Sequence, residues 1–88
     1  MNSPESLKAV IHCTMKAVAE EQGVTLVPLV DDTPLLESGL DSLSFAICVA
    51  ELESRLGYDP FVLMEEPIYP RTVREFVDIY ERFAHRRA

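Results

Sequence analysis

The sequence predicts an all-α fold: a small antiparallel four-helix bundle with three main helices, one short helix and a long loop between the first two. The first reason is that apolar residues recur at steps of three and four in three separate segments, as on the buried face of a helix. The second is size, because 88 residues with 48% hydrophobic content are typical of one globular domain. We therefore expect residues 1–88 to form one domain, with its core at about residues 4–84.

The first helix is expected over residues 4–22. Ser3 is suited to cap its start, Pro4 suits the first helical position, and Gly23 is suited to end it. Aliphatic residues at helical spacing are typical of a core-facing stripe. This stripe consists of Leu7, Val10, Ile11, Met15 and Val18.

Residues 24–40 are predicted to form a long ordered loop. Residues 24–30 are rich in β-branched side chains, but Pro28 interrupts them and no partner strand is visible in the sequence. Leu35 and Leu36 are expected to anchor a short helical turn. A loop of this length in a small domain is uncommon and often functional.

The other two main helices are predicted over residues 41–56 and from a Thr72 cap to about residue 84. Between them, Asp59 and Pro60 are suited to start a short helix or turn over residues 61–66. The expected inner stripe of the second helix is Ala46, Val49, Leu52 and Leu56. That of the last helix is Val73, Phe76, Val77, Tyr80 and Phe83.

The acidic composition limits the classes of partner. A net charge of −7 disfavours nucleic acid and anionic membranes, and favours proteins with positive patches. Residues 1–5 do not begin a signal peptide, and no apolar run is long enough to span a membrane, so a cytoplasmic location is expected. Cys13 and Cys48 both fall in helical patterns and are expected to be reduced, packed thiols.

Catalytic and metal-binding patterns are missing from the sequence. A serine hydrolase needs a base beside its nucleophile, and the two histidines, His12 and His85, lie on elements with no evident relation to a serine. The cysteines lack metal-ligand spacing, and no histidines are paired at helical spacing. We therefore expect no metal site and no enzymatic activity.

Ser42 stands where the glycine-containing loop meets the second helix. From the residues alone, two interpretations remain open. Ser42 can serve as a helix N-terminal residue that satisfies free backbone N–H groups. Alternatively it can carry a phosphate ester, since a helix N-terminus favours an anion and Gly39 allows a tight turn without bulk.

The stretch Gly39-Leu40-Asp41-Ser42-Leu43, followed by an amphipathic helix, resembles the attachment motif of acyl and peptidyl carrier proteins. The order of helices over about residues 4–84 is also similar to that of this family. The resemblance implies that a phosphopantetheinyl transferase attaches 4′-phosphopantetheine from coenzyme A to Ser42. It implies that Asp41 helps to hold the transferase's magnesium ion and coenzyme, and that Leu43 packs against partner enzymes.

The resemblance further implies a monomeric carrier without chemistry of its own, whose arm holds acyl or aminoacyl groups as thioesters for loading and processing enzymes. Its docking face would include Leu43, Ile47, Ala50 and Glu51. The second helix is less acidic than in classical fatty-acid carriers, which favours a specialised stand-alone carrier of secondary metabolism, such as polyketide or nonribosomal peptide synthesis. A fatty-acid carrier, an aminoacyl or peptidyl carrier, and an unmodified helical interaction module remain as alternatives.

Overall fold

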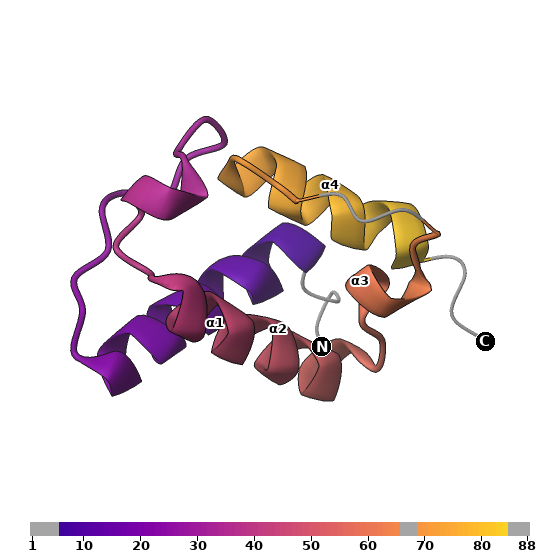
Figure 1. The fold of residues 1–88 in the computed structure, drawn as a ribbon, viewed down its shortest axis with the longest axis horizontal. Helices are drawn as coiled ribbons and strands as arrows, with labels where there is room; N and C mark the ends of the chain where they lie inside the picture. Colours follow the sequence, from indigo (N-terminus) through magenta and orange to yellow (C-terminus); the bar gives the residue numbers. More distant parts are fainter. Residues whose placement is uncertain (1–5, 66–68, 85–88) are drawn as a thin grey trace.

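The computed structural model describes residues 6–65 and 69–84. Within them the chain forms α1 (Leu7–Gln22), the short 3-10 helix η1 (Leu35–Glu37), α2 (Ser42–Leu56), α3 (Pro60–Leu63) and α4 (Val73–Ala84) (Figure 1). α1 packs against α2 and α4 and runs opposite to both, while α3 packs against α4. The predicted all-α bundle with a long loop between its first two main helices is confirmed.

The start of α1 differs from the prediction. Its cap is Ser6, whose hydroxyl accepts a hydrogen bond from the Ala9 N–H at 3.1 Å, so the helix begins at Leu7 rather than at Pro4. Ser3 and Ser6 are equally good capping residues, and the sequence pattern did not distinguish them. Ser3 and Pro4 lie outside the described residues. Gly23 ends the helix as predicted, in the left-handed conformation with φ of +72°.

The core lies between the inner faces of α1, α2 and α4. All five residues of the predicted stripe on α4 are buried, as are Ile11, Met15 and Val18 of α1. On α2 the prediction was partly wrong, because Ala46 is exposed while Ser44 and Cys48 are buried. All three side chains are small, and their size does not reveal which face of the helix they occupy. Cys13 is exposed, so only one of the two cysteines is a packed thiol.

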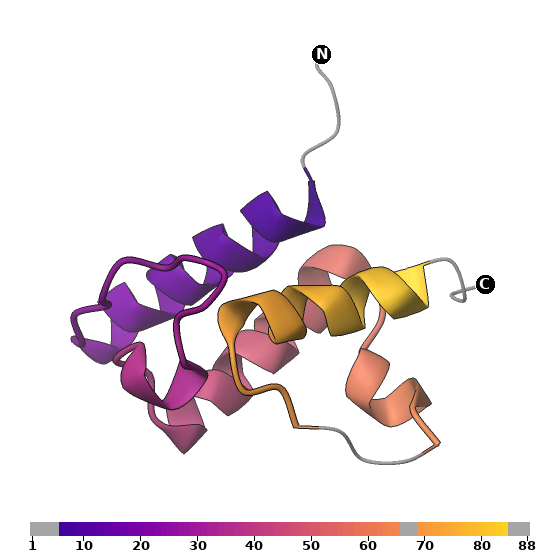
Figure 2. The ribbon, with the colours of Figure 1, turned by 90° about the horizontal axis from the view of Figure 1, so that it is seen from above.

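The long loop is fastened to the first turn of α4. Figures 1 and 2 both show its tip beside the start of that helix. Two N–H groups of the first turn, on Val73 and Arg74, donate to the carbonyls of Thr33 and Asp31, each at 3.0 Å. These groups have no partner within their own helix, so the loop satisfies them. A further bond joins the Leu35 N–H to the Arg71 carbonyl at 2.9 Å.

The remaining predictions for loops and helix ends are mixed. Thr72 caps α4 as predicted, accepting from the Glu75 N–H at 3.2 Å. Leu35 anchors the turn η1, but Leu36 does not, since it points to solvent. α3 ends at Leu63, short of the predicted residue 66, because Met64 is extended. Residues 66–68 and 85–88 lie outside the described residues. No helix in the described part of the chain is long and apolar enough to cross a membrane.

Candidate functional site

The loop in front of α2 turns at Gly39, which has a φ of +115°. A Cβ atom at this position would lie 2.5 Å from the Thr25 carbonyl oxygen, because two segments of the loop pass side by side here. The Val27 N–H donates to the Ser38 carbonyl at 3.0 Å and holds the segments together. Glycine is therefore required both by its φ and by the closeness of the neighbouring backbone.

The structure separates the three serines around this turn. Ser38 is buried, and its hydroxyl donates to the Leu35 carbonyl at 2.7 Å, so it holds the turn closed. Ser44 is buried against the core. Ser42, the first residue of α2, is exposed. Of the three hydroxyls, that of Ser42 is the one an approaching enzyme can reach.

The cap of α2 is Asp41, not Ser42. The Asp41 carboxylate accepts a hydrogen bond from the Ser44 N–H at 2.8 Å. This bond, more than any other contact, holds the pKa of the Asp41 carboxyl below its usual range. Asp41 therefore does the capping that the first interpretation gave to Ser42, and the Ser42 hydroxyl is left without this structural task.

An exposed apolar strip continues from Ser42 along α2. Leu43 is 66% exposed, and Ala46 and Ala50 follow it on the outer face, one turn apart. Glu51 is exposed beside them, while Ile47 is half-buried and packs against the core. Of the docking residues expected from the sequence, Leu43, Ala50 and Glu51 are accessible and Ile47 is accessible in part.

A groove of about 690 Å³ opens beside Ser42. Its walls come from η1 and the start of α2, which are close in the sequence, and from the segment before α4, which is far from both but meets them here. No pattern in the sequence indicates that these segments meet. The lining residues are Pro34, Leu35, Leu36, Glu37, Leu40, Asp41, Ser42, Phe45, Tyr69, Pro70 and Arg71.

The structure does not bring a histidine to the groove beside Ser42 among the described residues. His12 lines a different cavity, of about 490 Å³, between α1 and the loop. Burial, followed by the positive charges of Lys8 and Lys16, lowers the pKa of His12. His85 lies outside the described residues. In the described ranges, no three His, Cys, Asp or Glu side chains are grouped so as to hold a metal ion.

The two thiols differ in reactivity. Cys48 is fully buried, and burial followed by the charge of Glu51 raises its pKa to about 11. Since the thiolate is the reactive form, Cys48 is inert at neutral pH. Cys13 is exposed on α1. Neither thiol lines the groove beside Ser42.

Comparison with known proteins gives one match. The family model described as a phosphopantetheine attachment site matches residues 15–63, more than half of the chain. The matched stretch runs from the middle of α1 through the loop and η1 to the last residue of α3, and it includes the turn at Gly39 and the exposed Ser42. Searches of curated proteins and of solved structures gave no match.

Proposed function

The chain belongs to the phosphopantetheine attachment site family, whose prosthetic group is 4′-phosphopantetheine, and we propose that Ser42 carries this group. The observation that carries the proposal is the exposure of Ser42 at the start of α2, while Ser38 and Ser44 are buried. Asp41 relieves Ser42 of the capping role. The Ser42 hydroxyl is therefore accessible and is not needed to cap the helix.

The surroundings of Ser42 fit a phosphodiester. The absence of a side chain at Gly39 leaves the turn narrow, and the groove provides open space on one side of the hydroxyl. The N-terminal end of a 15-residue helix favours a negative group. Because the Asp41 carboxylate already takes up the Ser44 N–H, the attached phosphate would stay at the surface rather than in a closed pocket.

Attachment would be carried out by a transferase, since no histidine among the described residues lines the groove beside the hydroxyl. Ser42 Oγ would lose its proton to the transferase and attack the pantetheine-side phosphorus of coenzyme A. The bond to the bridging oxygen would break, with adenosine bisphosphate as the leaving group. Asp41, exposed one residue earlier, would contribute its carboxylate to the transferase's magnesium ion.

The attached group supplies a thiol that holds an acyl or aminoacyl group as an activated thioester. The chain's own residues present this arm and perform no chemistry. A tethered cargo meets each docked enzyme at high effective concentration. Loading and processing enzymes would dock on the strip formed by Leu43, Ala46 and Ala50, with Glu51 at its edge.

We further propose a specialised carrier of secondary metabolism rather than a carrier of fatty-acid synthesis. The outer face of α2 supports this, because it is apolar at Leu43, Ala46 and Ala50 and carries a positive charge at Arg55. Partners that recognise such a face would rely on shape and apolar contact more than on a dense acidic surface. An aminoacyl or peptidyl cargo is compatible with the same face.

Coexpression with a phosphopantetheinyl transferase tests the proposal. Intact mass should show the gain of one phosphopantetheinyl group, and the gain should be lost in Ser42→Ala. Ser54→Ala, which changes an exposed serine on the same helix, is the matched control and should be modified normally. If several active transferases add nothing to the chain, the proposal fails and the chain is an interaction module instead.

A further inference from the structure

A groove opens beside Ser42, and attachment of an arm uses it only as open space next to the hydroxyl. We propose that it binds an uncharged, apolar acyl group carried on the Ser42 arm, so that the cargo rests outside the bundle core between transfers. The inference rests on the proposed function, because it takes Ser42 as the attachment point. It adds the place where the cargo lies and the chemical class of cargo that fits.

The rim of the groove exposes large apolar side chains that the fold does not use. Leu36 is 87% exposed and Tyr69 is 82% exposed. Leu40 and Phe45 lie deeper and pack with the core. An apolar wall with an apolar rim is a site where burying a hydrocarbon chain is favourable. The volume, about 690 Å³, falls in the range of small-molecule sites.

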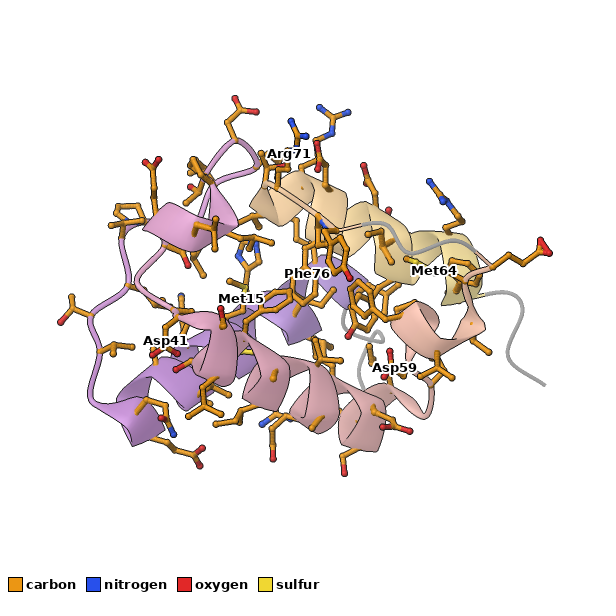
Figure 3. All side chains as sticks on the ribbon, viewed as in Figure 1. Met15, Asp41, Asp59, Met64, Arg71 and Phe76 are labelled. Carbon is orange, nitrogen blue, oxygen red and sulfur yellow. The ribbon has the colours of Figure 1, made fainter. Side chains whose placement is uncertain are left out.

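The interior of the bundle is the other place where a cargo could be sheltered, and it is filled. Figure 3 shows Phe76 pointing from α4 into the space toward α2. Its ring lies 4.9 Å from that of Phe45 and 5.3 Å from that of Tyr80, centroid to centroid. Phe61 closes the cluster at 6.3 Å from Phe76 and 6.0 Å from Tyr80. Entry of a chain would require these packed rings to move apart and lose contacts with one another. Binding in the groove requires no such loss.

Because the cargo is covalently attached to the chain, even weak affinity for the groove is sufficient to keep it there. Ser42 itself lines the groove, so an arm fixed to its hydroxyl starts at the edge of the site. A tethered group occupies a neighbouring site at an effective concentration far above that of a free ligand. The arm contains polar amides, so most of the favourable burial comes from the hydrocarbon cargo rather than from the arm.

The charges around the groove restrict the cargo class. Glu37 and Asp41 line the groove together with Ser42, and the hydrogen bond from the Ser44 N–H lowers the pKa of the Asp41 carboxyl, so that it is charged at neutral pH. An anionic group near them would be repelled. Arg71 lies on the wall formed by the segment before α4, where its stem can cover apolar surface. An uncharged aliphatic or aromatic acyl group meets these conditions best.

Amide NMR spectra of three forms of the chain provide the test: apo, modified from coenzyme A, and modified from octanoyl coenzyme A. We expect the octanoyl form to differ from the unacylated modified form at Leu36, Phe45 and Tyr69. Shifts centred on Phe61, Phe76 and Tyr80 would instead place the chain in the core and overturn the inference. So would spectra of the two modified forms that do not differ. A chain that gains no mass at Ser42 overturns the proposed function as well, so the two failures are distinguishable.

Cleavage of the octanoyl thioester by hydroxylamine gives a second readout. A chain held in the groove should slow cleavage by on the order of fivefold relative to octanoyl coenzyme A. The double variant Leu36→Ser with Tyr69→Ser should remove this protection while leaving the fold intact, since both side chains are exposed. Val62→Ser, at an apolar residue on α3 that is 77% exposed and outside the groove, is the control. Equal protection in the double variant and the control contradicts the proposal.

Discussion

The starts of α2 and α3 share one capping arrangement but turn their first side chains in opposite directions. Asp41 accepts from the Ser44 N–H at 2.8 Å, and Asp59 accepts from the Phe61 N–H at 2.9 Å. Figure 3 shows the two aspartates at opposite ends of α2. At the first helix start the next residue, Ser42, is exposed, while at the second the next residue, Pro60, is fully buried.

The difference shows that a cap determines where a helix begins but not which of its side chains are exposed to solvent. The rotation of each helix is set by its apolar residues farther along. In α2, Cys48 and Leu52 turn inward and leave Leu43 outside. In α3, Phe61 packs against the rings of the core, and the start of the helix is drawn in with it. The proposed function of α2 therefore rests on the exposure of the residue after the cap, not on the cap itself.

The starts of α2 and α3 should differ most in the free energy of unfolding that is lost when the second residue of each helix is truncated. Phe61→Ala removes a ring that contacts Phe76 and Tyr80, and should lower the free energy of unfolding by about 3 kcal/mol. Leu43→Ala should change it by less than about 0.5 kcal/mol, because the side chain is mostly exposed. Urea unfolding measures both. Similar losses in the two variants would mean that Leu43 also packs in the core.

The rotation of α2 can be tested through its thiol. Burial raises the pKa of Cys48 to about 11 from 9.0, which lowers its thiolate fraction at neutral pH roughly a hundredfold. Apo protein treated with iodoacetamide at neutral pH should therefore be labelled at Cys13 and not at Cys48. In denaturant both thiols should react. Rapid labelling of Cys48 in the native protein would contradict the rotation that exposes Leu43.

The turn before α2 should be more sensitive than an ordinary helix end. Gly39→Ala places a methyl group against the Thr25 carbonyl in addition to straining the backbone, and should cost about 2–3 kcal/mol. Gly23→Ala is the matched control. It has a positive φ but nothing within 4 Å of the added carbon, so it should cost about 1 kcal/mol. Thermal or urea unfolding would show the difference, and equal losses would mean that the loop relaxes freely at Gly39.

The smallest effect concerns the charge of the cap itself. Because the folded state lowers the pKa of Asp41, its ionised form adds stability above the usual aspartate pKa of about 4, and this is lost as the pH falls through the lowered value. Asp41→Asn can keep the hydrogen bond without the charge. The loss of stability between pH 7 and pH 3 should therefore be slightly smaller in this variant. Urea unfolding at both pH values measures it, and an unchanged loss would show that the charge contributes nothing.

The sequence predicted best where large apolar residues repeat. On α4, the stripe from Val73 to Phe83 and the Thr72 cap are confirmed, because one face is aromatic and aliphatic and the other is charged. On α2 the rotation was partly mispredicted, since Ala46, Ser44 and Cys48 are all small and give no strong preference for either face. The start of α1 was placed too early because Ser3 and Ser6 offer the same capping chemistry.

The site was predictable only where it is local in sequence. The tight turn expected at Gly39 is confirmed by its φ of +115°, whereas the capping role of Asp41 was not predicted. The groove was not predictable, because Leu36, Phe45 and Tyr69 come from three segments that only the folded chain brings together. Nothing in the periodicity of any one segment indicates that its neighbours will form a wall.

The hydrogen bonds between the loop and α4 have a consequence for the order in which the protein matures. They join residues 31–35 to residues 71–74, so the loop in front of Ser42 cannot reach its final geometry until residue 74 has left the ribosome. The stretch matched by the family model ends at residue 63, so it is synthesised before residues 71–74, to which the loop is hydrogen-bonded. A nascent chain that already contains the whole attachment motif therefore still lacks the hydrogen bonds that hold the loop in front of it. If Ser42 carries the arm as proposed, we expect its modification to follow formation of the first turn of α4 rather than accompany synthesis of the loop.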